Sequence, residues 1–299
     1  MITLLTGGTG FLGREIAKRS DIGIIKTLGR SESDYCVDLA KEIPQLEDIE
    51  LVIHCAGKAH MVPKSEKERA EFFEVNVKGT ENLLIALSNM GNPLREFVLI
   101  SSVAVYGKEA ANNINEETPL EAVDPYGKSK IQKEELVKDW CYKNKVTCTI
   151  LRLPLLVGTN APGNLGAMIR GIEKGYYFNI AGGHAKKSMV LAKDVAAIIN
   201  VVASIGGTYN LTDGYHPNFS ELSEAIAKQL GKPKPRNLPN WLATFIAGLG
   251  DIIGQRSPIS SKKLKKITSD LTFDDTKAKK TFGWKPERVL ERFSIIKSN

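Results

Sequence analysis

Residues 2–13 read ITLLTGGTGFLG, and this short stretch decides the fold. Its first five residues are typical of a buried strand, and a helical pattern begins at Phe11. A strand, a glycine-rich turn and a helix in this order predict a site for the diphosphate of a dinucleotide, because bare backbone lets the phosphates approach the helix N-terminus. We expect the stretch to bind a cofactor through Gly7, Gly10, Phe11, Leu12 and Gly13.

Short apolar runs alternate with longer amphipathic segments through the first half of the chain. This alternation predicts an α/β fold, a Rossmann-type doubly wound parallel sheet with helices on both faces. The expected strands are residues 2–6, 23–28, 34–37, 51–55, 97–101 and 147–151, and the expected helical segments include 66–90 and 126–142.

The composition of the sequence changes after residue 156, where glycine, proline and asparagine become frequent. We therefore expect a dinucleotide-binding domain over residues 1–156. Residues 157–299 are expected to form mainly a smaller C-terminal substrate-binding lobe, with segments that return to the sheet. The apolar segment Trp241–Ile253 is too short to span a bilayer and predicts an amphipathic lid or a core helix.

The end of the second expected strand bears on the choice of dinucleotide. An acidic residue there would accept from a free adenosine ribose hydroxyl, whereas an arginine would pair with a 2′-phosphate. The strand ends in Leu28-Gly29-Arg30, so Arg30 predicts NADP(H) as the preferred cofactor, with NAD(H) possible. Asp38 is placed to accept from the adenine amino group, and its neighbour Leu39 is a further expected cofactor contact.

Tyr126 and Lys130 lie four residues apart at the expected start of a helix, so they share one helix face. A nearby ammonium favours the phenolate and should lower the pKa of the tyrosine from about 10. Ser102 comes at the carboxyl end of a buried strand, where parallel sheets place their active sites. We expect Ser102, Tyr126 and Lys130 to be catalytic, with Ser102 bonding the reacting sugar oxygen and Lys130 also binding the nicotinamide ribose.

Five segments carry a family resemblance: TGGTGFLG, VIHCAGKAH, EVNVKGTENLL with Asn76, ISSVAVYG and YGKSK. Together they resemble an extended short-chain dehydrogenase/reductase of the nucleotide-sugar epimerase/dehydratase superfamily. The resemblance implies the Ser102–Tyr126–Lys130 set and adds Ala56 to the expected cofactor contacts. It also implies a homodimer built on two helices from each subunit, here expected around Ala70–Met90 and Gly127–Tyr142.

Segments in the second half resemble bacterial enzymes that act at C4 of UDP-N-acetyl-6-deoxyhexoses: LRLPLLVG, PGN, KKSMVLAKDVA and KAKKTFGWKP. In this pattern Asn164 would contact the nucleotide sugar, and Lys187 would contact its diphosphate. Lys187 replaces a more usual arginine, and Val157 replaces a common tyrosine. The resemblance thus implies a UDP-sugar substrate.

The first expectation for function is NADPH-dependent reduction of a UDP-4-keto-6-deoxy-N-acetylhexosamine in the synthesis of a surface polysaccharide precursor. A nucleotide-sugar 4-epimerase is the alternative, since it uses the same residues but oxidises and re-reduces C4 on a retained cofactor. A regulator that senses redox state without turnover is a second alternative. A 4,6-dehydratase is disfavoured because Val103 and Ala104, rather than an acidic pair, follow Ser102.

Composition narrows the class of protein further. The 299 residues carry a formal charge of +7, and residues 257–299 hold eleven Lys or Arg against five Asp or Glu. No nucleic-acid motif accompanies this local excess, so we expect an anionic small substrate rather than nucleic acid. No metal-ligand spacing is present and no signal peptide precedes Ile2, which predicts a cytoplasmic protein with reduced cysteines, no metal and no stable membrane insertion.

Overall fold

The computed structural model describes residues 1–59, 62–253 and 260–295, and its centre is a parallel sheet. The strand order is β11-β7-β5-β4-β1-β2-β3, and each neighbouring pair is parallel. The strands are β1 (Ile2–Thr6), β2 (Ile24–Gly29), β3 (Tyr35–Cys36), β4 (Leu51–His54), β5 (Glu96–Ser102), β7 (Thr147–Leu153) and β11 (Gly207–Asn210). The strand order reverses its direction at β1 and β4, and this reversal opens the crevice in which doubly wound sheets bind ligands. The predicted Rossmann-type fold is confirmed.

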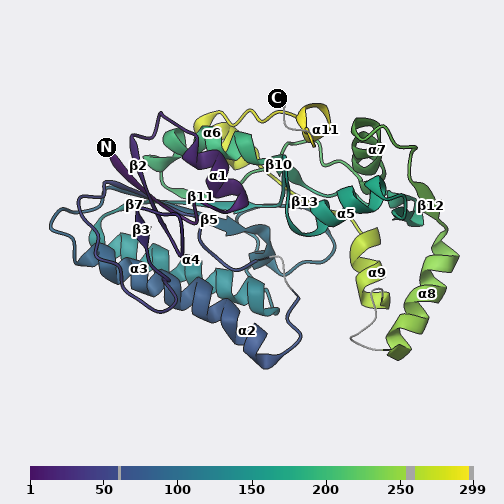
Figure 1. The fold of residues 1–299 in the computed structure, drawn as a ribbon, viewed down its shortest axis with the longest axis horizontal. Helices are drawn as coiled ribbons and strands as arrows, with labels where there is room; N and C mark the ends of the chain where they lie inside the picture. Colours follow the sequence, from purple (N-terminus) through teal and green to yellow (C-terminus); the bar gives the residue numbers. More distant parts are fainter. Residues whose placement is uncertain (60–61, 254–259, 296–299) are drawn as a thin grey trace.

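Helices cover both faces of the sheet (Figure 1). Neighbouring strand residues point to opposite faces, and Leu4 and Leu5 of β1 are both fully buried, so both faces need a cover. Leu5 lies in a core with α1 (Phe11–Ala17), α6 (Ala192–Ala203) and α10 (Thr276–Phe282). Leu4 lies in a second core, with α3 (Gly79–Ser88) and α4 (Pro125–Asn144).

The segment 66–90 differs from the single helical segment that the sequence predicts. It forms α2 (Glu66–Phe73), a π-helical turn η1 (Glu74–Lys78) and then α3. The wider π turn changes which side chains face inward, and Asn76 within it is fully buried. Such turns are frequent at functional sites.

The edge strand β3 is shorter than predicted, covering two residues where the sequence predicts four. The Asp34 carboxylate accepts from the backbone N–H of Thr27 at 2.8 Å and so occupies the place of a ladder hydrogen bond. Strand pairing therefore begins one residue later, at Leu28 and Tyr35.

The second half of the chain contributes both to the sheet and to a smaller lobe. Strand β11 joins the edge of the main sheet, and α6 and α10 pack on it. The lobe holds the paired strands β8 (Leu155–Val157) with β10 (Met189–Leu191) and β9 (Phe178–Ile180) with β12 (Arg236–Leu238). Its helical elements are α5 (Gly163–Glu173), η3 (Ala181–Gly183), α7 (Phe219–Gln229), α8 (Asn240–Ile253), α9 (Ser261–Thr268) and α11 (Val289–Arg292).

A two-stranded pair lies between the two halves of the chain. Strand β6 (Ala111–Ile114) pairs with β13 (Leu271–Phe273), and both lie near the 3₁₀ turn η2 (Val103–Tyr106) that follows Ser102. A segment from the carboxyl-terminal part of the chain is thereby joined to the end of β5. Among the described helices, none is long and apolar enough to cross a membrane.

Candidate active site

The glycine-rich turn lies between β1 and α1 and faces the chain just after β4. Gly7 has φ +70°, and a Cβ there would lie 2.8 Å from the backbone nitrogen of Ala56. A Cβ on Gly13 would lie 2.1 Å from the carbonyl oxygen of Gly7, so only glycine lets the helix pack directly on the turn. The backbone N–H of Gly10 donates to the same oxygen at 2.9 Å. The turn therefore offers bare backbone beside Ala56, which fits a dinucleotide diphosphate.

Three of the expected cofactor residues contribute to packing through their side chains. Leu12 and Leu39 lie in the two cores on opposite faces of the sheet. The ring of Phe11 approaches the second lobe, because a Cβ on Gly158 would lie 3.1 Å from its Cζ. The side chains of Leu12 and Leu39 are thus core residues, and any contact with a cofactor falls to their backbone.

Arg30 and Asp38 lie beyond the end of β2. Arg30 is exposed, and Gly29 before it is the last residue of the strand. Asp38 accepts from the backbone N–H of Ala40 at 3.2 Å and lies 3.7 Å from the Lys41 ammonium. The Asp38 carboxylate is therefore engaged within its own turn, while the guanidinium of Arg30 faces solvent.

Ser102 and Tyr126 meet at the carboxyl end of β5. Asp124 caps α4 by accepting from the backbone N–H of Gly127 at 3.0 Å, with Pro125 in the first turn. A Cβ on Gly127 would lie 2.9 Å from the carbonyl oxygen of Ala104, so this glycine allows the helix start to approach η2 closely. The approach places the hydroxyl of Ser102 near that of Tyr126, where it influences the pKa of the phenol.

One face of α4 carries polar side chains into the protein instead of out to solvent. Lys130 Nζ donates to the carbonyl oxygen of Ile100 at 2.8 Å, and Lys133 Nζ donates to that of Ala56 at 2.7 Å. Glu134 Oε1 accepts from Ser101 Oγ at 2.6 Å. The spacing of three and four residues places all three side chains on the same face. Helix α4 is therefore bonded both to the strand that carries Ser102 and to the wall of the glycine turn.

Burial governs the ionisation of these groups. Burial lowers the pKa of Lys130 to about 8, although Glu134 and Cys55 oppose the shift. The pKa of Lys133 is lowered further, by burial and by the neighbouring Lys130 charge. Burial raises the pKa of Cys55 to about 12, so this thiol stays protonated.

The tyrosine differs from the sequence-based expectation. Burial raises the pKa of Tyr126, the nearby hydroxyl of Ser102 opposes the rise, and the Asp124 carboxylate adds to it. The Lys130 ammonium is engaged by the carbonyl of Ile100 and does not lower the phenol's pKa in this structure. Tyr126 is therefore held as a neutral phenol, the form that donates a proton.

Asn76 joins the end of β4 to α4. Its Oδ1 accepts from the backbone N–H of Lys58 at 2.7 Å, and its Nδ2 donates to Ser129 Oγ at 2.9 Å. A Cβ on Gly57 would lie 2.9 Å from Asn76 Oδ1, so the backbone after β4 passes close to the amide. The π-helical turn thus positions a residue that holds the backbone after Ala56 beside the catalytic helix.

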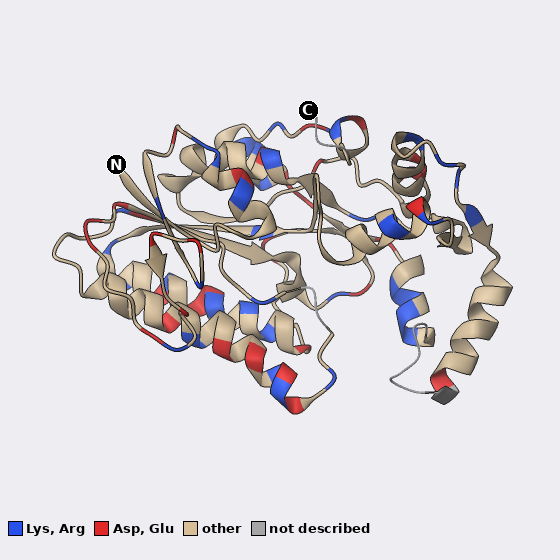
Figure 2. Cartoon of the chain, viewed as in Figure 1, with Lys and Arg blue, Asp and Glu red and all other residues tan. Residues whose placement is uncertain are grey.

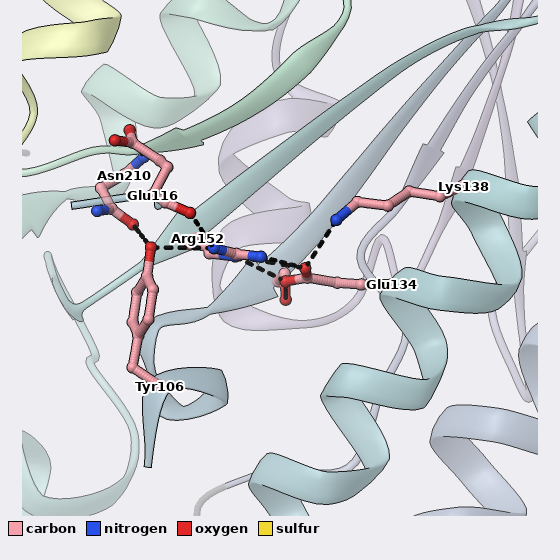
Figure 3. Close-up of polar contacts among 7 residues, drawn as sticks. Tyr106, Glu116, Glu134, Lys138, Arg152 and Asn210 are labelled. Atoms are coloured by element: carbon pink, nitrogen blue, oxygen red, sulfur yellow. Dashed lines mark hydrogen bonds and ion pairs between the residues drawn. The ribbon is translucent and has the colours of Figure 1, made fainter. Parts of the chain in front are cut away.

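Figure 3 shows a buried network around Arg152, at the end of β7. Arg152 Nη2 lies 2.7 Å from Glu134 Oε2, and Arg152 Nη1 donates to the Tyr106 hydroxyl at 3.0 Å. The Tyr106 hydroxyl donates to Asn210 Oδ1 at 2.8 Å, and the Asn210 backbone N–H donates to Glu116 at 2.7 Å. The network connects α4 with the ends of β7 and β11 and with the turn that follows Ser102.

The two expected substrate residues lie in the second lobe, on elements separate from the Ser102 strand. Asn164 is exposed in the first turn of α5. Lys187 Nζ donates to the carbonyl oxygens of Lys266 at 3.0 Å and Ser269 at 2.8 Å, at the carboxyl end of α9. The Lys187 ammonium is therefore engaged by a helix end, an arrangement that stabilises helix carboxyl termini.

Several residues of this site were not predicted from the sequence: Lys133, Glu134, Arg152, Tyr106 and Asn210. One local feature of the sequence points to two of them: Lys133 and Glu134 share a single helix face with Lys130. Among the described residues, no group of three or more His, Cys, Asp or Glu side chains is placed to hold a metal ion.

Comparison with known proteins identifies the class to which this fold and site belong. The family described as the NAD dependent epimerase/dehydratase family matches residues 3–211. The chain belongs to this family, as the sequence resemblance predicts.

Curated relatives align over most of their length. An Escherichia coli O157:H7 N-acetyl-alpha-D-glucosaminyl-diphospho-ditrans,octacis-undecaprenol 4-epimerase is 29% identical, over 92% of this chain and 87% of that protein. A Vibrio cholerae UDP-glucose 4-epimerase is 26% identical, over 96% of this chain and 92% of that protein.

Solved structures share the fold. A Thermus thermophilus UDP-glucose 4-epimerase in complex with NAD has a TM-score of 0.72 and 20% identity, over 96% of this chain and 94% of that one. A Pseudomonas aeruginosa protein named RMD in complex with NADPH has a TM-score of 0.71 and 22% identity, over 97% of this chain and 95% of that one.

Proposed function

We propose that this protein is a 4-epimerase of a hexose or N-acetylhexosamine carried on a diphosphate, either UDP or a polyprenyl diphosphate. The observation that carries the proposal is the placement of Ser102 and Tyr126 next to each other, beside buried Lys130, at the carboxyl end of β5. The relatives support inversion at C4, because they are named as 4-epimerases of UDP-sugars and of a polyprenyl diphosphate sugar. The proposal therefore adopts the alternative expected from the sequence, a sugar 4-epimerase, over net reduction at C4.

Tyr126, Ser102 and Lys130 have different roles in the reaction at C4 of the sugar. When bound, a nicotinamide dinucleotide supplies the hydride exchange at C4. The neutral phenol of Tyr126 would first have to lose its own proton to solvent, a change that the positive charge of a bound oxidised nicotinamide would favour. As the phenolate, Tyr126 would take the proton from the C4 hydroxyl when the alcohol is oxidised, and it would return that proton when the ketone is reduced. Ser102 orients that oxygen through its hydroxyl, and Lys130 holds the cofactor side of the site. The bare backbone of Gly7 and Gly10 beside Ala56 receives the diphosphate of the cofactor.

Net reduction of a 4-keto sugar is the second candidate, and the end of β2 favours it. Gly29 leaves no carboxylate at the last position of the strand, and the exposed Arg30 is free to meet a 2′-phosphate. A preference for NADP(H) would agree better with a cofactor that exchanges on every turnover than with one that is retained.

A pair of assays separates the two reactions. The epimerase should interconvert UDP-N-acetylglucosamine and UDP-N-acetylgalactosamine, or the polyprenyl diphosphate forms, with no net change in nicotinamide absorbance. The reductase should instead consume NADPH and a UDP-4-keto-6-deoxy-N-acetylhexosamine in equal amounts. Failure of both assays, with the protein folded and cofactor bound, would favour the non-catalytic redox sensor.

The cofactor preference has its own test. Arg30→Ala should weaken NADP(H) binding about ten- to a hundredfold, the loss that follows removal of one hydrogen bond to a charged group. Binding of NAD(H) should hardly change. Lys26→Ala, within the strand β2 that precedes Arg30, is the matched control. Equal losses for both cofactors would show that Arg30 does not recognise the phosphate.

We also propose a homodimer that uses the helices α3 and α4. These helices lie on the same face of the sheet, and Ile85 and Tyr142 on them are exposed. Analytical ultracentrifugation should give twice the chain mass, and Ile85→Glu should shift the protein toward the monomer. A monomeric wild type at micromolar concentration would contradict the proposal.

A further inference from the structure

Three buried polar side chains meet where the strand order of the main sheet reverses. Thr6 ends β1 and His54 ends β4, and the two residues are register partners on these neighbouring parallel strands. The histidine ring lies between two threonine hydroxyls, with Nδ1 2.6 Å from Thr6 Oγ1 and Nε2 3.0 Å from Thr80 Oγ1 on α3. None of the three residues is more than 2% exposed. The group therefore lies in the protein interior, at strand ends that border the crevice.

The surroundings of His54 keep its ring uncharged. The strands β1 and β4 carry no Lys, Arg, Asp or Glu and are tan in Figure 2. Burial, and then the positive charges of Lys133 and Lys130 on α4, hold the pKa of the His54 imidazole well below its usual range. At neutral pH the ring therefore has one nitrogen that donates a hydrogen bond and one that accepts.

The hydrogen bonds of the two threonines decide which ring nitrogen carries the proton. The Thr80 hydroxyl donates to the backbone carbonyl oxygen of Asn76 at 2.7 Å, so the Thr80 oxygen can only accept from His54. Nε2 is then the protonated nitrogen, and Nδ1 accepts from the Thr6 hydroxyl. Thr6 Oγ1 in turn accepts from the backbone N–H of Ala56 at 3.1 Å. One arrangement of protons therefore satisfies every member of the group.

Asn76 extends the same chain of hydrogen bonds to the catalytic helix α4. Its Nδ2 donates to Ser129 Oγ at 2.9 Å, and the Ser129 hydroxyl donates to the backbone carbonyl oxygen of Tyr126 at 2.8 Å. Asn76 and Ser129 are both fully buried. At the other end of the chain, the Ala56 backbone lies against the glycine turn at Gly7. The hydrogen bonds thus run from the wall of the cofactor site to the residue that carries the phenol.

We propose that His54 is a positioning residue, which fixes the wall of the cofactor site at Ala56 relative to Tyr126. Through Thr6 it holds the backbone beside the glycine turn, and through Thr80 it holds the helical segment that carries Asn76. A fully satisfied network of buried polar groups specifies a single geometry. That geometry matters for the reaction, because a displacement of about 1 Å between reacting groups can lower a rate about a hundredfold.

The part of the inference that concerns Tyr126 rests on the proposed function, whereas the part that concerns the cofactor does not. The chain belongs to an NAD dependent family, so the binding of NADH and NADPH can be measured without any sugar substrate. If wild type binds a cofactor but changes no sugar at C4, the proposed function fails, and cofactor binding by the His54 variants still decides the role of this residue.

Two substitutions of His54 separate the two ends of the network. In His54→Asn the amide oxygen takes the place of Nδ1 and can accept from Thr6, but the contact with Thr80 is lost. In His54→Gln the amide nitrogen takes the place of Nε2 and can donate to Thr80, but the acceptor for Thr6 is lost. Titration with NADH and NADPH should give a Kd about threefold to tenfold weaker for His54→Gln, the loss expected from one hydrogen bond, and within about twofold of wild type for His54→Asn. A wild-type Kd in His54→Gln for both cofactors would overturn the proposal.

Thr80 offers a milder change in the same network. Thr80→Val keeps the shape of the side chain but removes the acceptor for His54, and Thr80→Ser restores the hydroxyl. Thr149→Val is the matched control, because Thr149 is an equally buried threonine whose hydroxyl donates to the carbonyl oxygen of Val202 at 2.7 Å. Turnover at C4 should fall about tenfold in Thr80→Val, return to within about twofold of wild type in Thr80→Ser, and stay unchanged in Thr149→Val. If Thr80→Val and Thr149→Val lose similar stability and both keep wild-type turnover, the network serves only the fold and the proposal is wrong.

The position of the proton can be observed in the unaltered protein. Two-bond correlation spectra between ring protons and ring nitrogens should show His54 as a neutral imidazole with its proton on Nε2, and His54→Asn identifies the signal by its loss. The signal should keep this form as the pH falls through 6.5, the ordinary pKa of histidine. A proton on Nδ1, or a ring that becomes charged near pH 6.5, would contradict the hydrogen-bond arrangement and overturn the proposal.

Discussion

Helices α4 and α8 break the ordinary pattern of a surface helix in opposite directions. Helix α4 buries Lys130, Lys133 and Glu134, whereas α8 exposes Trp241 and Phe245. Buried charge costs free energy unless it is hydrogen-bonded, and exposed large apolar side chains leave surface unburied. Neither arrangement is favoured by folding alone. The comparison teaches that a departure from the polar-out, apolar-in pattern is where a structure indicates function.

On α4 the buried polar side chains hold the helix against the sheet at the candidate active site. Each buried polar group bonds a strand end: Lys130 bonds Ile100, Lys133 bonds Ala56 and Glu134 bonds Ser101. These contacts fix the catalytic helix against both halves of the site. On α8 the exposed apolar side chains, among them Trp241 and Phe245, face solvent.

The largest expected effect comes from the end of α4. Tyr126→Phe keeps the ring and its packing on Phe72 but removes the transferable proton. Turnover should fall by about two to four orders of magnitude, the usual share of general acid–base catalysis, with cofactor binding retained. Tyr142→Phe, near the exposed end of the same helix, should leave turnover unchanged. A Tyr126→Phe protein with wild-type turnover would contradict both the epimerase and the reductase hypotheses.

The second prediction concerns the cost of buried charge on α4. Arg152→Met leaves the carboxylate of Glu134 buried without its main partner, and should lower the free energy of unfolding by about 3 to 5 kcal/mol. Adding Glu134→Gln should restore much of the loss, because the uncompensated charge is then gone.

Urea unfolding measures this difference, and a surface pair on the same helix is the control. Asp139→Ala removes the exposed partner of Lys143, whose ammonium lies 2.7 Å from the carboxylate. The exposed pair should contribute only a small fraction of the buried one. Similar losses for Arg152→Met and Asp139→Ala would mean that burial adds nothing to this pair.

The parts that the sequence predicts well depend on neighbours along the chain. The turn at Gly7 to Gly13 is recognisable because strand, glycines and helix are contiguous, and Tyr126 and Lys130 are one helical turn apart. Their assembly with Ser102 follows from the rule that parallel strands end at the same edge. The likeness to a solved structure confirms the parallel-sheet fold that this rule assumes.

The remainder of the site depends on contacts between distant residues. Glu134 meets Arg152 from the next strand, and Tyr106 meets Asn210 from a strand in the second half of the chain. Asn76 is turned inward by a π-helical turn that the periodicity of residues 66–90 does not reveal. A sequence pattern shows that Lys133 and Glu134 share a face with Lys130, but only packing decides that the face is inward.

The third prediction uses the lowered pKa of Lys130. Since this pKa lies near 8, the ammonium loses its charge as the pH rises through about 8, and activity should decline up to about tenfold per pH unit above it. Stability should change with the opposite sign. The unfolded chain keeps Lys130 protonated up to about pH 10.5, so deprotonation of the folded form raises the free energy of unfolding between those values.

Matched pH profiles of activity and urea unfolding check both signs. Lys130→Met should lack the part of the rise in stability above pH 8 that deprotonation of Lys130 causes. This variant should also be inactive. Lys130→Arg keeps a charge throughout, so any residual activity should lack the decline near pH 8. A wild-type profile that stays flat to pH 10 would show that the ammonium form of Lys130 is not required.

The smallest expected effect lies at Lys187, which bonds the end of α9 and is the expected contact of the substrate diphosphate. Its ammonium has three N–H donors, and two of them bond the carbonyl oxygens at the end of α9. The remaining donor can meet a substrate diphosphate, so Lys187→Ala should raise KM about threefold to tenfold, with less effect at high salt and none on cofactor affinity. Lys186→Ala, at the exposed neighbouring position, should leave KM unchanged. If KM stays at the wild-type value while hydrogen exchange in α9 becomes faster, Lys187 only anchors α9 and does not bind the substrate.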